Sequence, residues 1–277
     1  MKILKVIKSQ PSQDGDGVKI NRIAAFDGRL LDPYLMIDEL KSDDSQDFMG
    51  GFPPHPHRGI ETFTYIIKGG FEHQDQMGNK KAIRAGDVQW MSTGSGVLHS
   101  EMPLADAKLG MHGFQIWLNM AAKDKMRDSR YGDSTLAPLP SVENETGAQL
   151  KALAGSWHFA DQAIESPLND LSTGAALADF TFAPNGSAEL SLGEFDTVAI
   201  YIHTGSLAGY SAGHLLLIDA KQDVSLLADQ QGAGILLLCG RKINEPVAHL
   251  GPFVMNTQDE LKQAVRDYQN GFFGQIN

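Results

Sequence analysis

The sequence predicts an all-β protein built from two tandem β-barrels and one short C-terminal α-helix. Short runs of β-branched and aromatic residues alternate with glycine-containing turns in both halves of the chain. A charged, proline-containing stretch between about residues 121 and 153 separates the two sets and is predicted to be a crossover with few strands. We therefore expect one barrel in residues 1–130, and a second barrel carrying the helix in residues 131–277.

Composition and charge exclude several classes of function. The chain has 277 residues, of which 42% are hydrophobic, so it can bury a substantial core. Its formal net charge is −11 without any lysine- or arginine-rich run, which argues against direct nucleic-acid binding. The single cysteine, Cys239, excludes an internal disulfide and a multi-thiolate zinc site, and is predicted to be a buried thiol.

The sequence also carries no signal for a membrane location. Its N-terminus lacks the apolar region of a signal peptide, and no stretch approaches about 18 apolar residues. We therefore expect a cytoplasmic protein without membrane association.

The first 50 residues are predicted to form entry strands and loops. Residues 3–7 are a short apolar segment, and residues 18–23 alternate between apolar and polar side chains. Residues 35–40 include Asp38 and Glu39, which we interpret as solvated or structurally hydrogen-bonded carboxylates rather than functional ones.

Residues 51–101 follow as a series of β-hairpins. Four strand-like runs are separated by turns that contain glycine, and they cover residues 62–67, 71–76, 81–84 and 88–91. Short strands and close turns are typical of a small barrel with a site in its mouth.

Both ends of this hairpin region carry a pair of metal-ligating residue types. His55 and His57 are two positions apart, so an extended chain projects both from one face, and His99 and Glu101 repeat the spacing. Brought together, three imidazoles and a carboxylate suit Fe(II), Mn(II), Ni(II) or Zn(II) better than Ca(II) or Mg(II). The alternative is four polar side chains on a hydrated sheet face, but two such pairs in glycine-rich turns favour the metal.

Other histidines have weaker signals. His73 shares a predicted strand face with Asp75, and could line the pocket, hydrogen-bond a ligand's outer nitrogen, or simply be exposed on a hairpin. His112 is interpreted as a pocket wall or a structural residue rather than a fifth ligand. The second half of the chain has only isolated histidines, each expected to be structural: His158, His203, His214 and His249. We therefore expect the barrel in residues 1–130 to bind the metal and the barrel in residues 131–277 to be metal-free.

The C-terminal helix is predicted from its capping pattern. Thr257 and Glu260 match a capping box. Apolar side chains then recur at helical spacing, at Leu261, Ala264, Val265 and Tyr268. Gly271 marks the predicted end of the helix. This apolar stripe should pack against a barrel.

Two segments of the hairpin region resemble signature motifs of a known family. Residues 54–62 (PHPHRGIET) and 94–101 (GSGVLHSE) resemble the two motifs of the cupin superfamily. Their exact sequences are similar to those of the pirin family, whose members are bicupins. Further similarity lies at residues 32–39, 115–119 and 251–257. The resemblance implies metal ligands at His55, His57, His99 and Glu101. It implies that Glu61, where many cupins place a ligand, lies just outside the ligand set.

The resemblance also implies two competing functions. Some pirins are linked to quercetin 2,3-dioxygenase activity, which implies Fe(II), or else Ni, Mn, Cu or Zn, with a flavonol-like substrate and O2. Glu101 would then be the catalytic base that takes the proton of the flavonol 3-hydroxyl, before ring opening releases carbon monoxide. Other pirins are metal-dependent regulatory partners of transcription factors or metabolic enzymes. An acidic chain without a recognisable interaction motif favours the dioxygenase.

Overall fold

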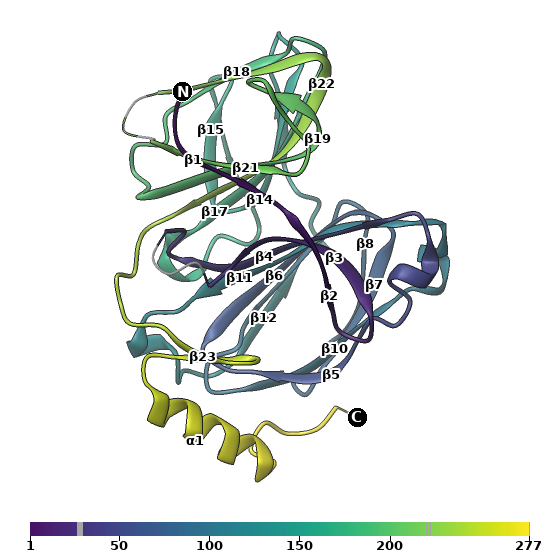
Figure 1. Cartoon of the computed structure of the whole chain (residues 1–277), viewed down its shortest axis with the longest axis vertical. Helices are drawn as coiled ribbons and strands as arrows, with labels where there is room; N and C mark the ends of the chain where they lie inside the picture. The colour runs from purple at the N-terminus through teal and green to yellow at the C-terminus, as the bar shows by residue number, and fades with distance from the viewer. Residues whose placement is uncertain (27–29, 220, 222, 277) are drawn as a thin grey trace. The chain divides into compact units, whose positions relative to one another are not determined.

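Strands dominate the protein, and the described residues contain one α-helix, near the C-terminus (Figure 1). The structure is a computed structural model that describes residues 1–26, 30–219, 221 and 223–276. These elements confirm the all-β prediction with a C-terminal helix. Short 3-10 helices accompany the strands, namely η1 (Ser45–Asp47), η2 (Ala105–Leu109), η3 (Ala122–Asp124) and η4 (Ser172–Gly174).

The chain divides into two β units, as predicted, but at different places. The histidine unit, named for His55, His57 and His99, comprises Gln10–Leu30, Tyr34–Leu136 and Ile243–Asn277. The companion unit comprises Met1–Ser9, Leu31–Pro33 and Ala137–Lys242. These bounds differ from the predicted division into residues 1–130 and 131–277, because both ends of the chain join the other unit.

Two sheets form the barrel of the histidine unit. The larger sheet has the strand order β12–β9–β6–β11–β4–β3–β2, and the smaller has the order β5–β10–β7–β8. The larger sheet contains β2 (Gln10–Asp14), β3 (Val18–Ala25), β4 (Tyr34–Ser42), β6 (Ile60–Lys68), β9 (Val88–Ser92), β11 (Met111–Asn119) and β12 (Arg130–Asp133). The smaller contains β5 (Phe52–His57), β7 (Gly70–Asp75), β8 (Lys80–Arg84) and β10 (Val97–Pro103).

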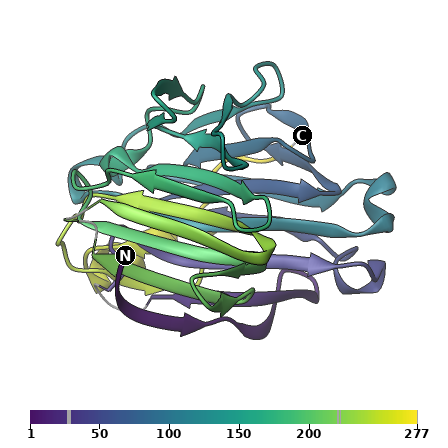
Figure 2. The same ribbon diagram turned by 90° about the horizontal axis from the view of Figure 1, so that it is seen from above.

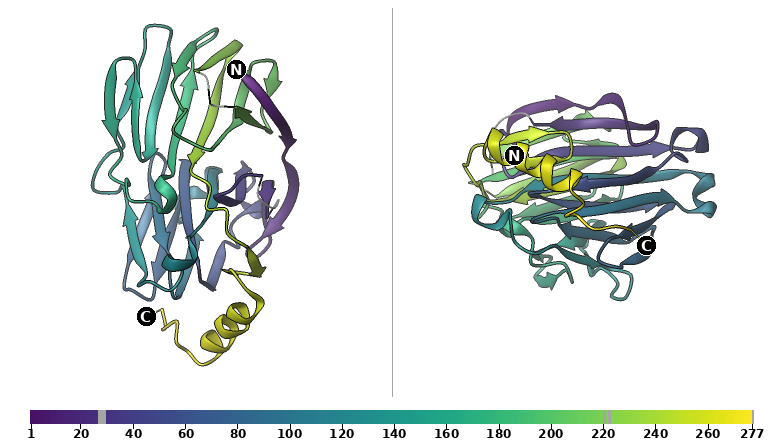
Figure 3. Two further views of the ribbon diagram at one scale, coloured as in Figure 1. Left: turned by 90° about the vertical axis from the view of Figure 1, so that its left-hand side faces the viewer. Right: turned by 90° about the horizontal axis from the view of Figure 1, so that it is seen from below.

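The C-terminal segment packs against the histidine unit (Figure 3). It contains β23 (Ala248–Leu250), β24 (Phe253–Met255) and α1 (Gln258–Gln269). Thr257 caps α1 and forms the predicted capping box with Glu260. Leu261 and Ala264 of the predicted apolar stripe are buried, and they pack on Phe253, Met255 and Phe273 of the C-terminal segment itself. Val265 is only partly buried and Tyr268 is exposed.

A glycine permits this packing next to the histidine pair. Gly59 has a φ of +78°, and a Cβ atom there would collide with the carbonyl oxygen of Val254 in β24. The amide of Val254 in turn donates to the Arg58 carbonyl at 3.0 Å. Glycine is therefore needed at position 59 both for its backbone conformation and for the close approach of β24.

The companion unit contains an extensive apolar core. Its main sheet follows the order β1–β21–β19–β22–β17–β14–β13, with β18 and β20 paired to β22 and β19, while β15 and β16 form a separate hairpin. Figure 2 shows the green strands of this unit side by side. The strands are β1 (Lys2–Lys8), β13 (Ser141–Glu143), β14 (Ala148–Ala154), β15 (Ser156–Phe159), β16 (Gln162–Glu165), β17 (Ala176–Phe182), β18 (Ser187–Leu190), β19 (Thr197–Leu207), β20 (Tyr210–Ser211), β21 (His214–Asp219) and β22 (Val224–Gly240). Cys239 is a fully buried thiol in this core, as predicted.

Two expectations about the chain path need correction. β1 belongs to the companion unit because its main chain pairs antiparallel with β21. The stretch predicted to be a crossover contains β12, β13 and β14, and β12 extends the larger sheet of the histidine unit by pairing with β9. The sequence of β12, Arg-Tyr-Gly-Asp, lacks the apolar alternation by which strands are recognised. Among the described residues, no helix has the length and apolar character needed to cross a membrane.

Candidate metal centre

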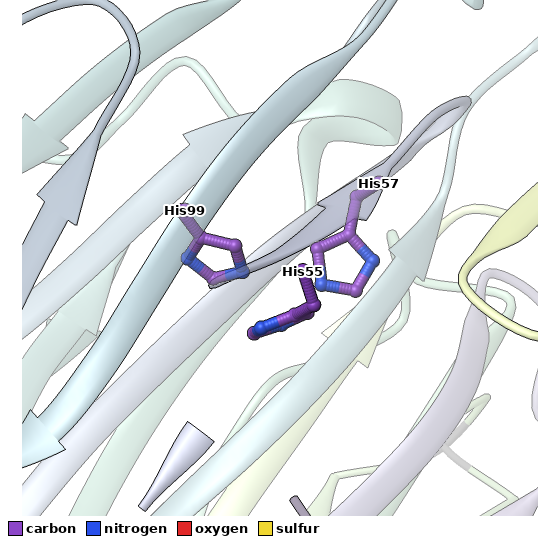
Figure 4. Close-up of side chains that lie close together, drawn as sticks. All are labelled: His55, His57 and His99. Atoms are coloured by element: carbon purple, nitrogen blue, oxygen red, sulfur yellow. The ribbon is translucent and has the colours of Figure 1, made fainter. Parts of the chain in front are cut away.

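Strand register brings three histidines together. β5 and β10 are antiparallel neighbours, and His99 lies directly opposite His55. The ring centroid of His99 is 4.3 Å from that of His55 and 5.0 Å from that of His57, and the two β5 rings are 4.8 Å apart (Figure 4). One nitrogen from each ring lies within 4.8 Å of the others. These three predicted ligands therefore converge on one point.

Hydrogen bonds orient the two histidines of β5. Nδ1 of His55 lies 2.8 Å from the Pro53 carbonyl oxygen, and Nδ1 of His57 lies 3.3 Å from that of Pro252. A carbonyl oxygen only accepts, so each Nδ1 carries the proton and donates it. Nε2 of each ring is therefore left with its lone pair, which is the form that binds a metal ion.

His99 provides the test of whether a metal ion fits. Its side chain is fully buried, and neither of its ring nitrogens has a hydrogen-bond partner among the described residues. Buried polar atoms are almost always partnered, because an unpaired one loses its hydration without compensation. A divalent transition metal bound by three imidazoles would supply the missing partner, so the donor set fits such an ion.

The protonation state of the cluster also suits metal binding. Burial lowers the pKa of His57 well below its usual value, and the neighbouring His55 lowers it further. Burial likewise lowers the pKa of His99, with additional effects from His55, His57 and His73. Both rings are therefore neutral near pH 7, and no proton has to be displaced before they bind a metal ion.

Glu101 lies beside this cluster with both carboxylate oxygens hydrogen-bonded. Oε1 accepts from Oγ1 of Thr64 at 3.1 Å, and Oε2 accepts from Nε2 of Gln115 at 2.8 Å. Glu101 forms a second group with His99 and His73, whose ligand atoms lie within 4.8 Å of one another. The structure thus brings Glu101 next to His99, but groups it with His73 rather than with His55 and His57.

His73 is a buried neighbour of the cluster. Its side chain is 1% exposed, so the alternative of an exposed hairpin histidine is wrong. Nε2 lies 3.1 Å from Oδ2 of Asp75, and the ring packs 5.5 Å from that of His99 and 4.9 Å from that of Tyr131. Nδ1 has no partner among the described residues.

Two other residues have structural partners. Glu61 is fully buried, and its Oε1 accepts from Nη2 of Arg127 at 3.0 Å. It belongs to neither group of candidate ligands found in the described part of the chain. Nε2 of His112 lies 2.9 Å from Oε1 of Glu39, which confirms the interpretation of both residues as structurally hydrogen-bonded.

A cavity of about 710 Å³ opens onto the histidines. His55, His57 and Glu101 form part of its lining. Apolar side chains make up most of the rest, and several are aromatic: Phe26, Phe52, Phe71, Phe114 and Trp117. A cavity of this size and character suits a small, mostly apolar ligand with a few polar groups.

Sequence reasoning missed several residues of the cavity lining, among them His249, Arg22 and Asp38. His249 was assigned to the second barrel, but it belongs to the histidine unit and stacks on Phe26, with ring centroids 3.9 Å apart. Arg22 and Asp38 also line the cavity. The signal for Arg22 was available, because it continues the inward-facing set of β3 after Val18 and Ile20.

Comparison with known proteins agrees with this geometry. The pirin family model matches residues 18–118, and the model of the pirin C-terminal cupin domain matches residues 177–274. A Vibrio cholerae protein, provisionally named a quercetin 2,3-dioxygenase, is 42% identical over 275 residues, covering 98% of this chain and 97% of that protein.

Solved structures share the same fold. The crystal structure of a quercetin 2,3-dioxygenase from Acinetobacter baumannii superposes with a TM-score of 0.87 and 27% identity, covering 100% of this chain and 99% of that one. The Escherichia coli pirin YhhW, determined in complex with nickel(II), has a TM-score of 0.65 and 23% identity, covering 86% of this chain and 99% of that one. The latter likeness supports the fold alone.

Proposed function

Because the chain belongs to the pirin family, we propose that it is a metal-dependent dioxygenase of the quercetin 2,3-dioxygenase type that acts on flavonol-like substrates. The observation that carries the proposal is the cluster of three imidazoles, which opens into a cavity with aromatic walls. The names of the Vibrio cholerae and Acinetobacter baumannii relatives support the same chemistry.

The metal would be held by His55, His57 and His99, with Glu101 as the fourth ligand. Fe(II) is our first choice, and the same nitrogen and oxygen donors accept nickel, manganese, copper or zinc. When bound, such an ion supplies a Lewis acid that favours the deprotonated flavonol and its reaction with O2.

Glu101 is proposed to act as the base for the flavonol 3-hydroxyl. Gln115 and Thr64 hold its carboxylate from both sides, so that it meets the substrate in a fixed orientation. Once the proton is on Glu101, both atoms of O2 enter the product and the hydroxyl-bearing carbon leaves as carbon monoxide. The electrons come from the substrate, so no external reductant is needed.

The aromatic walls have a separate role in this proposal. Phe52, Phe71 and Phe114 line the cavity and offer flat apolar faces to a planar substrate. Stacking on them would position the ring and exclude water from the reacting carbon.

The test is a reconstitution that separates an enzyme from a binding protein. Metal-free protein is loaded anaerobically with Fe(II), quercetin is added, and O2 is then admitted while the flavonol absorption and dissolved O2 are followed. We expect flavonol and O2 to disappear together, and His55→Ala to abolish both. If protein loaded with Fe, Mn, Ni or Cu consumes no O2 with any flavonol, the regulatory alternative, with a transcription factor or metabolic enzyme as partner, replaces the dioxygenase.

A further inference from the structure

A row of polar residues crosses the larger sheet of the histidine unit. Directly opposed residues on neighbouring strands share a face of the sheet. In order across β12, β9, β6, β11, β4 and β3, this row consists of Asp133, Gln89, Thr64, Gln115, Asp38 and Arg22. Thr64, Gln115, Asp38 and Arg22 all line the cavity. The row therefore carries polar groups along the cavity wall, away from the histidines.

Arg22 is fixed in place by two carboxylates. Its Nε and Nη2 donate to the two oxygens of Asp38 at 2.9 and 2.7 Å, and Nη2 also donates to Oδ2 of Asp14 at 2.9 Å. A bidentate contact of this kind holds the guanidinium plane in one orientation. The N–H groups of Nη1 have no acceptor among the described residues, and the side chain is 29% exposed. Arg22 thus keeps donors available at the cavity wall.

The position of Arg22 relative to Glu101 matches the length of a multi-ring ligand. Gln115, which donates to Glu101, is separated from Arg22 by β4, so two interstrand spacings lie between them. This corresponds to about 10 Å. A planar molecule of two or three rings whose reacting hydroxyl lies at Glu101 could therefore reach Arg22 with a hydroxyl of an outer ring.

The charges around Arg22 select the chemistry of that distal end. Asp14 and Asp38 carry two negative charges against the one positive charge of Arg22, so a carboxylate or sulfate on the ligand is disfavoured. A neutral hydroxyl both donates and accepts hydrogen bonds. Two adjacent hydroxyls match the site best, because one can donate to Asp14 while the other accepts from Nη1 of Arg22.

We propose that Arg22, Asp14 and Asp38 form a distal subsite that binds the ortho-dihydroxyphenyl ring of a flavonol. This inference rests on the proposed function and names the substrate class. Arg22 is a specificity-determining residue in this arrangement, because it contacts the end of the substrate that does not react.

The test measures binding rather than turnover. The dissociation constants of quercetin and galangin, two flavonols that differ only by the hydroxyls of the distal ring, are measured anaerobically on metal-loaded protein by fluorescence quenching. We expect quercetin to bind about tenfold more tightly, as hydrogen bonds to charged groups allow. Arg22→Met should reduce this preference to within about twofold.

Matched variants keep the result interpretable. Lys19→Met removes a positive charge from the exposed side of the same strand, where Lys19 pairs with Asp47, and should keep the full preference. Because Arg22→Met leaves Asp38 buried without its cation, Arg22→Lys and Asp14→Ala are measured as well. Asp14 is 46% exposed, so its replacement spares the core. Both variants should lower the preference severalfold.

The outcomes separate this inference from the proposed function. Equal affinity of the wild-type protein for both flavonols, or full preference in folded Arg22→Lys and Asp14→Ala, overturns the subsite even if flavonols are cleaved. Preference for quercetin without O2 consumption supports the subsite and contradicts the proposed dioxygenase function. Failure to bind either flavonol contradicts both the distal subsite and the proposed dioxygenase function.

Discussion

Nη1 of Arg58 donates a 2.7 Å hydrogen bond to Oδ2 of Asp267, which ties the residue after His57 to the C-terminal helix. Nε of Arg58 also donates to the carbonyl oxygen of Ser95 at 2.6 Å, in the turn before β10. The guanidinium lies 4.8 Å from the ring centroid of Phe273. One side chain therefore connects both ligand-bearing strands to the C-terminal segment.

We expect Asp267→Asn to weaken metal binding although residue 267 contacts no ligand. The substitution removes the charge that holds Arg58, and loss of such supporting contacts typically costs about tenfold to a hundredfold in metal affinity. Titration of metal-free protein with Zn(II) against a competing chelator measures the change. Asp259→Asn is the control, since Asp259 forms an exposed pair with Lys262 on the same helix. Equal affinities in the two variants would show that this link does not support the metal site.

The metal content should depend on the histidine cluster. We expect one divalent ion per chain in the wild-type protein, and substantial loss in His55→Ala and in His99→Ala, because each variant removes one of three converging donors. Elemental analysis of the purified proteins gives the count. His214→Ala, which changes a histidine of the companion unit, should retain the ion. Full retention of the metal ion in both cluster variants would show that His55 and His99 are not its ligands.

Glu101→Gln should abolish most flavonol cleavage while the protein still folds. The amide keeps the size of the side chain and an oxygen acceptor for Thr64 or Gln115, but it cannot take a proton. Loss of the base predicts a fall in kcat of about 10²–10⁴-fold. Single-turnover absorption changes under O2 measure it.

Glu61→Gln serves as the comparison for Glu101→Gln. It should weaken the contact with Arg127 and lower stability, yet retain the metal and most of the activity. If Glu61→Gln instead lost the metal and Glu101→Gln retained it, the ligand set would be that of most other cupins, with Glu61 in the first coordination sphere.

Lys125 should make stability depend on pH in the alkaline range. Its ammonium is buried and donates to the Gly59 carbonyl and to Oδ1 of Asn119, both at 2.7 Å. Burial lowers its pKa from 10.5 to about 8. Between these values the unfolded chain binds more protons than the folded one, so the unfolding free energy rises with pH by up to about 1.4 kcal/mol per unit.

Urea unfolding at several pH values checks this dependence. Lys125→Met should flatten the rise between about pH 8 and pH 10.5, and should lower stability near neutral pH because its acceptors lose their donor. Lys262→Met, at an exposed position on α1, should keep the wild-type slope. An unchanged slope in Lys125→Met would contradict the assignment.

Local sequence was enough to predict the histidine cluster. Alternation along a strand is a two-residue property, so His55 and His57 could be placed on one face without knowledge of the fold. Their convergence with His99 could be expected because each pair stood at a glycine-rich end of the same hairpin region. The capping box at Thr257 was equally local, and it predicted where α1 begins.

Contacts between residues far apart in the sequence could not be predicted in this way. The carbonyl that orients His57 belongs to Pro252, 195 positions away, and any residue could offer that carbonyl. Similarly, nothing in the sequence of residues 2–8 shows that β1 pairs with β21, because its side chains are mostly exposed and main-chain hydrogen bonds hold it. Such contacts depend on the path of the chain rather than on residue types.

This routing sets the order in which a ribosome can complete the two units. The companion unit needs residues up to Lys242, including its first strand from the N-terminus. The histidine unit has most of its strands synthesised earlier, yet it waits for residues 243–277 to supply Pro252 and Asp267. A chain that ends at Lys242 would therefore contain every strand of the companion unit, while its histidine unit would lack the contacts that Pro252 and Asp267 provide.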